Sequence, residues 1–261
     1  MSPGLSPVYR ERQRHWSRWL YRIQWMLLAL IFLSALALRL NLLHFLAAFD
    51  VFKAAGLAVL GMALLSMLVF LWGMVKRHGE ARNAALWAMV LGLLPMAVPL
   101  LTVGQDNFQR PPIHDITTDF RDPPQLLAAI ALRSDRDHRP EYGGEEVARL
   151  QRGEPAYRDI QPLQLAGMTV PAATALAAEV GEGLGWRIVT RSPNRGRVEA
   201  VARTPILGFT SDVAVRIRAE GEGARVDVRS ASRVGVGDMG ENARRIRRFL
   251  GGMRERAGVA H

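Results

Sequence analysis

The chain has 261 residues, contains no cysteine and carries a formal net charge of +10. The lack of cysteine excludes disulfides, thiol catalysis and cysteine-ligated metals. The basic excess is uneven, because ten Lys/Arg face three Asp/Glu up to Gly104, whereas 24 face 21 from Gln105 onward. Most of this excess flanks apolar segments and does not form a basic face on a domain, so the composition argues against nucleic acid as a partner.

Three apolar segments of about 20 residues each occupy the first half of the chain, over residues 23–43, 54–75 and 84–103. A helix of about 20 residues crosses the roughly 30 Å hydrocarbon layer of a bilayer. Core helices of soluble proteins rarely run so long without a polar face. The sequence therefore predicts a multi-pass membrane protein in which residues 23–104 form three transmembrane helices, with the lipid bilayer as a partner.

Loop charges predict how these helices are oriented. Residues 1–22 carry five arginines, and the turn between the second and third segments carries Lys76, Arg77 and Arg82. Positively charged loops stay on the cytoplasmic side of a bacterial inner membrane. The prediction is a basic cytoplasmic N-terminus over residues 1–22 and an extracytoplasmic domain over residues 105–261, which in a Gram-negative cell lies in the periplasm.

Residues 105–261 have the pattern of a soluble α+β domain. Two short helices are expected over residues 124–132 and 145–151, and residues 153–169 read as irregular or extended. A longer helix is expected over residues 171–184, because Thr169 can cap it and the apolar residues follow a helical period.

The period of the apolar residues then changes from about 3.6 to about 2, which indicates strands. Four strands joined by tight turns are expected over residues 186–191, 197–204, 209–219 and 224–233. A last helix is expected over residues 239–256, with Asp238 as its cap. This order predicts an antiparallel sheet of about four strands with helices on one face.

A polar segment follows the third apolar stretch. His114, Asp115 and Asp119 lie within six residues there, beside two threonines, and could supply a general base for hydrolysis. Their spacing matches no metal-binding motif, so neither a metal nor a cofactor is predicted. The alternative is a turn-rich segment whose Asp and Thr side chains bond to the local backbone.

A second polar segment joins the strand at 224–233 to the last helix. Its candidate ligand-binding residues are Arg229, Ser230, Ser232, Arg233 and Asn242. Arginines beside the N-terminus of a helix can bind a phosphate or a carboxylate.

An internal role for the same arginines is the alternative. Arg229 or Arg233 would then pair with Asp115, Asp119 or Asp212 and tie the first polar segment to the sheet. Both interpretations predict that the two polar segments meet in space.

The two segments also carry a resemblance. Residues 110–119 (RPPIHDITTD) and 227–246 (DVRSASRVGVGDMGENARRI), together with Gly185-Trp186 and Val198-Glu199-Ala200, resemble a bacterial domain-of-unknown-function family, numbered 1499. The resemblance covers roughly residues 108–251. It implies an N-terminal membrane region, and it implies no activity, because the family's chemistry is not established.

The leading hypothesis is an inner-membrane protein whose periplasmic domain binds a ligand or partner in the cell envelope without catalysis. The candidate partners are an envelope lipid, an anion or another membrane protein. One alternative is a membrane-tethered hydrolase that uses His114 with Asp115 or Asp119. Another is a subunit of a larger envelope complex, docked through its helices.

Overall fold

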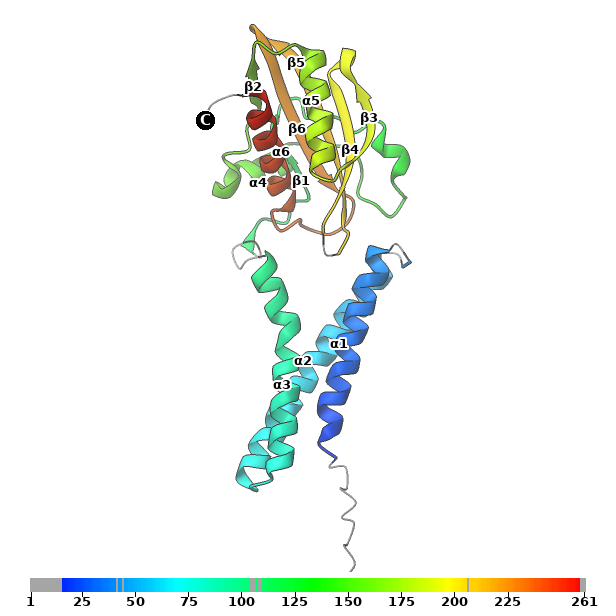
Figure 1. The fold of residues 1–261 in the computed structure, drawn as a ribbon, viewed down its shortest axis with the longest axis vertical. Helices are drawn as coiled ribbons and strands as arrows, with labels where there is room; N and C mark the ends of the chain where they lie inside the picture. Colours follow the sequence, from blue (N-terminus) through cyan, green and yellow to red (C-terminus); the bar gives the residue numbers. More distant parts are fainter. Residues whose placement is uncertain are drawn as a thin grey trace, which may run out of the picture. The chain divides into compact units, whose positions relative to one another are not determined.

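The chain folds into two compact units, Met1–Thr102 and Val103–His261 (Figure 1). The computed structural model describes residues 16–40, 42–43, 45–103, 107, 109–205 and 207–258. Residues 1–15 of the basic segment predicted over residues 1–22 therefore lie outside the described residues.

The first unit contains three long helices, α1 (Arg18–Arg39), α2 (Phe45–Val75) and α3 (Gly79–Val103). Among the residues described, two segments combine the length and the apolar composition of a membrane-crossing helix, namely Arg18–Arg39 and Ala47–Val75. The prediction of three such segments is thus confirmed for two. The third predicted segment lies in α3, a helix of 25 residues that is not among these two.

Small side chains and one amide hold the three helices together. Leu20 of α1 packs with Ala85 and Ala88 of α3, and all three are buried. The side-chain amide of Gln24 in α1 donates to the carbonyl oxygens of Val59 in α2 at 3.2 Å and of Ala88 in α3 at 3.3 Å. Small residues allow close approach of helices, and an interhelical hydrogen bond of this kind adds specificity.

The second unit is built on a six-stranded antiparallel sheet with the order β1-β6-β5-β4-β3, and β2 also pairs with β6. The strands are β1 (Asp115–Thr117), β2 (Leu163–Ala166), β3 (Arg187–Ser192), β4 (Arg197–Arg203), β5 (Thr210–Glu220) and β6 (Gly223–Ser232). The last four confirm the predicted strands. The predicted number of about four is too low, because β1 and β2 are three and four residues long and show no period of their own.

Three α-helices accompany the sheet, α4 (Gly144–Gly153), α5 (Val170–Gly183) and α6 (Glu241–Ala257). The Thr169 hydroxyl accepts from the Ala172 amide at 3.4 Å, as expected of a helix cap. Short 3-10 turns occur at η2 (Ala129–Leu132), η3 (Pro155–Tyr157) and η4 (Pro193–Arg195). The helix predicted over residues 124–132 is therefore wrong except for its last turn, η2.

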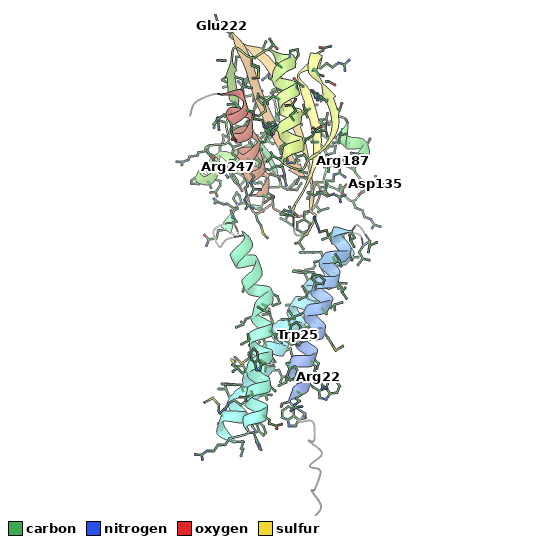
Figure 2. All side chains as sticks on the ribbon, in the orientation of Figure 1. Arg22, Trp25, Asp135, Arg187, Glu222 and Arg247 are labelled. Atoms are coloured by element: carbon green, nitrogen blue, oxygen red, sulfur yellow. The ribbon has the colours of Figure 1, made fainter. Side chains whose placement is uncertain are left out.

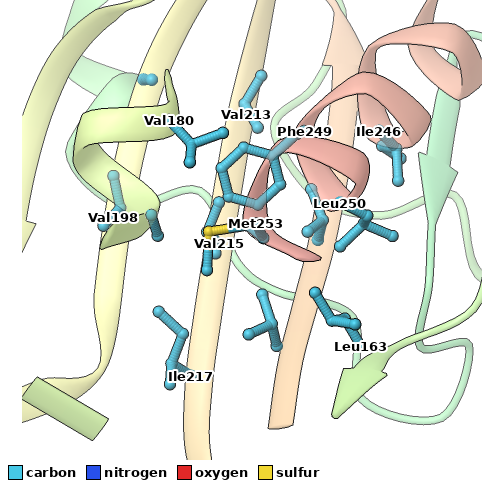
Figure 3. Close-up of a cluster of buried hydrophobic side chains, with 14 of the residues drawn as sticks. Leu163, Val180, Val198, Val213, Val215, Ile217, Ile246, Phe249, Leu250 and Met253 are labelled. Atoms are coloured by element: carbon cyan, nitrogen blue, oxygen red, sulfur yellow. The ribbon is translucent and has the colours of Figure 1, made fainter. Parts of the chain in front are cut away.

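Helices α5 and α6 lie on the same face of the sheet and enclose the main core (Figures 1 and 3). Phe249 and Leu250 of α6 meet Val213 and the other inward-facing residues of the central strands. Trp186 stacks on Phe249 with 5.1 Å between ring centroids. The expectation of helices on one face of the sheet is confirmed. Apolar and polar residues alternate along β5, so only one face of this strand is aliphatic and needs to be covered by helices.

Two glycines with similar backbone angles provide a test of this packing. Gly196 (φ 59°) follows η4, and a Cβ there would fall on the carbonyl oxygen of Ile217, whereas Gly221 (φ 58°) has open space around it. We expect Gly196→Ala to destabilise the domain by about 2–4 kcal/mol, from left-handed strain plus the clash, and Gly221→Ala by about 1 kcal/mol from the strain alone. Thermal unfolding of the full chain in detergent measures both, and equal losses would contradict the explanation.

Candidate functional site

The sheet face opposite α5 and α6 is charged, and it is nevertheless buried. Alternation along the strands places Glu199 of β4, Asp212 of β5, and Asp227 and Arg229 of β6 on this face, and all four are almost fully buried. An irregular segment, residues 118–142, covers them through the hydrogen bonds described below. The face therefore has to neutralise its charges internally.

Arg229 and Asp115 form the most buried ion pair of the two motifs. The guanidinium donates to both carboxylate oxygens, from Nε at 2.9 Å and from Nη2 at 2.7 Å. Nη2 also donates to the carbonyl oxygen of Pro140 at 2.9 Å. The ring of Tyr142 lies 5.5 Å from the guanidinium carbon. Because Arg229 is only 1% exposed, its bonding groups are directed at the protein itself.

Asp212 holds two arginines from different parts of the chain. Arg233 donates to it from Nη2 at 2.7 Å, and Arg133 of the covering segment donates from Nε at 2.7 Å. Arg133 also donates to the carbonyl oxygen of His138 at 2.6 Å. The end of β6 and the covering segment are thus joined through one fully buried carboxylate.

Glu199 explains why the predicted helix over residues 124–132 is short. One of its carboxylate oxygens accepts from three consecutive backbone amides, Leu127, Ala128 and Ala129, at 2.9, 2.9 and 3.0 Å. These amides begin η2, and a carboxylate at this position satisfies donors that a helix start leaves free. The chain upstream of Leu127 is consequently drawn onto the sheet and does not continue the helix.

Asp119 belongs to a cluster of carboxylates and arginines farther along the same face. Asp119, Asp122 and Asp227 contact three arginines from β5 and β6, namely Arg216, Arg218 and Arg225. Partial burial by itself would raise the pKa of Asp119, but backbone amides of Asp122 and Arg121 and the arginines outweigh it, so that this pKa is lowered. Asp119 therefore stays charged and bound.

The two serines of the second motif, Ser230 and Ser232, lie against Asn242 of α6. Ser230 donates to the side-chain oxygen of Asn242 at 2.8 Å, and the Asn242 amide nitrogen donates to Ser232 at 2.9 Å and to the carbonyl oxygen of His114 at 2.9 Å. The Asn242 backbone amide donates to the Asp238 carboxylate at 2.7 Å. Helix α6 nevertheless begins at Glu241 with Gly240 as its N-cap, so Asp238, predicted as the cap, lies two residues before the N-cap position. Each of these polar groups is satisfied within the domain.

His114 and His138 form a stacked pair beside this network, with 3.9 Å between ring centroids and 13° between planes. His138 also bonds to the carbonyl oxygen of Gly235 through Nε2 at 2.8 Å. Burial lowers the pKa of His114, His138 lowers it further, and Asp115 acts in the opposite direction. Within the described part of the chain no three His, Asp or Glu side chains gather as metal ligands.

The two motifs thus meet in space, as both interpretations predicted. The ion pairs of the internal alternative are present, through Arg229 with Asp115 and Arg233 with Asp212. Sequence reasoning missed Glu199, Arg133 and His138, which complete the network. A carboxylate on the aliphatic strand β4 was the available signal for Glu199, since charged residues are rarely buried without a partner.

The buried pair gives a test of this interpretation. We expect Asp115→Ala or Arg229→Met alone to destabilise the domain by about 3–5 kcal/mol, because each leaves the other charge buried without its partner. The joint change Asp115→Ala and Arg229→Met should cost less than the sum of the two. The exposed pair Asp159–Arg247 is the matched control, and Asp159→Ala should cost less than about 1 kcal/mol. Denaturant unfolding of the full chain measures all four, and additive losses would contradict a coupled pair.

The histidine pair predicts a pH dependence. Because the pKa of His114 in the folded chain is below its ordinary 6.5, the unfolded chain binds more protons between the two values, and stability must fall as pH falls through that window. Replacing His114 by phenylalanine keeps the ring stack and should flatten this loss of stability as the pH falls below about 6.5. The same replacement at His78, in the helical unit, should leave the pH dependence of the domain unchanged. An unaltered slope in the His114 variant would contradict the assignment.

Comparison with known proteins supports the resemblance noted in the sequence. A search of curated proteins finds no relative of the chain. Residues 115–253, more than half of the chain, match the model of one family, described as "Protein of unknown function (DUF1499)". The match spans β1, the whole sheet and α6 as far as Met253. The chain is therefore a member of the DUF1499 family.

Proposed function

We propose that the chain is an inner-membrane protein that carries an extracytoplasmic domain, and that this domain acts by binding an envelope lipid, an anion or a membrane-protein partner. The observation that carries the proposal is the combination of an apolar helical unit with a domain in which Asp115, Asp119 and all five candidate ligand-binding residues are bonded within the fold.

The helical unit supports a third membrane crossing by α3. Its 25 residues extend about 37 Å at 1.5 Å per residue, which exceeds a hydrocarbon layer of about 30 Å. No Asp, Glu, Lys or Arg follows Arg82 within α3. The Gln24 amide also bonds to α2 and α3 together, which favours one bundle in which the three helices cross side by side.

The charges favour an extracytoplasmic domain. Lys76, Arg77 and Arg82 lie at or next to the α2–α3 turn, and five arginines precede residue 23. Both regions belong on the cytoplasmic side by the positive-inside rule. With three crossings, the chain after Val103 emerges on the opposite side.

Binding is favoured over hydrolysis because both candidate bases are bound. Asp115 is held by two bonds from Arg229, and the pKa of Asp119 is lowered. A general base works best with a pKa near the operating pH, whereas the pKa of Asp119 is moved away from it and both oxygens of Asp115 are occupied by Arg229. His114 alone is left for the hydrolase, and no carboxylate hydrogen bond orients its ring among the contacts described for it.

Single cysteines in the cysteine-free chain test the membrane arrangement. Gly79, with open space around it at the α2–α3 turn, and Glu222, at the tip of the β5–β6 hairpin, are suitable positions (Figure 2). A membrane-impermeant maleimide added to cells with a permeable outer membrane should label Glu222→Cys directly and Gly79→Cys only after the inner membrane is opened. Labelling in the reverse order would overturn the orientation, and labelling of both from one side would show that α3 does not cross.

A further inference from the structure

A cleft of about 190 Å³ opens on the helix-covered side of the domain. It lies between the C-terminal turn of α5, the end of β4 and the first turns of α6, where Leu184, Trp186, Ala202 and Pro205 form its apolar part. Strand β3 begins opposite Val201, so the last residues of β4 have no strand partner on this side.

One wall of the cleft is rigid and aromatic. Trp186 stacks on Phe249 at 5.1 Å, and Gly181 leaves room for its ring, since a Cβ at Gly181 would lie 3.0 Å from it. Leu184 stands at the rim and is 38% exposed. A ligand that contacts both side chains would bury apolar surface against a wall that does not need to rearrange.

The other walls are basic. Arg203, Arg245 and Arg248 line the cleft with a single carboxylate, Glu241. Glu241 is held mainly by Arg244, at 2.6 Å, and lies 3.8 Å from Arg245. The cleft therefore keeps an excess of positive charge.

Arg245 is the feature that most needs an explanation. Its side chain is 5% exposed, and its Nη1 bonds to neutral partners, Ser230 at 3.1 Å and Asn242. Burial lowers the pKa of this arginine. The nearest carboxylate described for it, that of Glu241, lies 3.8 Å away and is shared with Arg244 at 2.6 Å, so the buried charge is only partly compensated. Burying an incompletely paired charge is costly, and an anion in the cleft would reduce that cost.

We propose that this cleft binds the anionic oxygen group of an amphiphilic ligand, a phosphate or a carboxylate, with the adjoining carbon atoms on Trp186 and Leu184. The guanidinium groups of Arg245 and Arg248 would receive the anion, since arginine matches phosphate and carboxylate geometry. The volume corresponds to roughly six water molecules at about 30 Å³ each, enough for one such group and a few carbons. The proposal deepens the binding function above and rests on it.

Thiol protection tests the site on the full chain in non-ionic detergent. A single cysteine at Leu184 reports on the rim, and one at Glu222, at the β5–β6 hairpin, is the control. The probes are inorganic phosphate, phosphatidylglycerol and the zwitterionic phosphatidylcholine. At a probe concentration about ten times the dissociation constant, alkylation of Leu184→Cys should slow about tenfold, while alkylation of Glu222→Cys should not change.

A variant that removes one positive charge tests whether protection of the cysteine depends on the arginines. Adding Arg248→Ala, at an exposed position of α6 that folding does not require, should weaken binding about tenfold through loss of a charge-assisted bond. Arg256→Ala removes the same charge from an exposed position at the end of the same helix and should have no effect.

The outcomes separate the sources of the anion. Protection by phosphatidylglycerol alone identifies a lipid head group with its apolar part, and protection by phosphate as well identifies a small free anion. No protection by either, protection by phosphatidylcholine to the same degree, or insensitivity to Arg248→Ala would overturn the proposal. The labelling order of Gly79→Cys and Glu222→Cys does not depend on the cleft, so a failed site and a failed membrane arrangement give different results.

Discussion

The ion pair between Arg229 and Asp115 connects parts of the domain that lie far apart in the chain. Strand β1 consists of three residues and pairs with β6, so its ladder by itself supplies few hydrogen bonds. The guanidinium reaches across from β6 to the β1 carboxylate and to the Pro140 carbonyl. One buried cation thus fixes both the entry of the chain into the sheet and the end of the covering segment. A pair of this kind specifies an arrangement more than it adds stability, because desolvation offsets much of its attraction.

Other buried carboxylates of the charged face also bind the covering segment. Glu199 binds three backbone amides of the covering segment, and Asp212 joins Arg133 of that segment to Arg233 of β6. A sheet with one aliphatic face and one charged face would normally leave the charged face in water. Here the covering segment replaces water, residue by residue, with carboxylate and guanidinium partners.

Most residues that maintain the fold differ from those that line the cleft. The polar residues that look most like a site in the sequence maintain the fold. The cleft, with Arg248 and Leu184 at its exposed edge, lies on the helix-covered side of the sheet, opposite the charged face. A binding domain attached to apolar helices is consistent with that separation, because its scaffold and its contact surface draw on different residues. Arg245 links the two, since its neutral partners Ser230 and Asn242 belong to the second motif.

Features that depend on residues close together in the chain were predictable from the amino-acid sequence. Two apolar helices of membrane length, the strands β3 to β6, the helices α5 and α6, and the family were all predicted. Each rests on a period, a cap or a motif within one segment. Strands β1 and β2, the short η2 and the choice of partners were decided only by the tertiary structure. Arg229 and Asp115 are 114 residues apart in the chain, and several carboxylates were chemically equivalent candidates for either arginine. Only the register of β1 on β6, which places Asp115 opposite Ala231 and next to Arg229, selects among them.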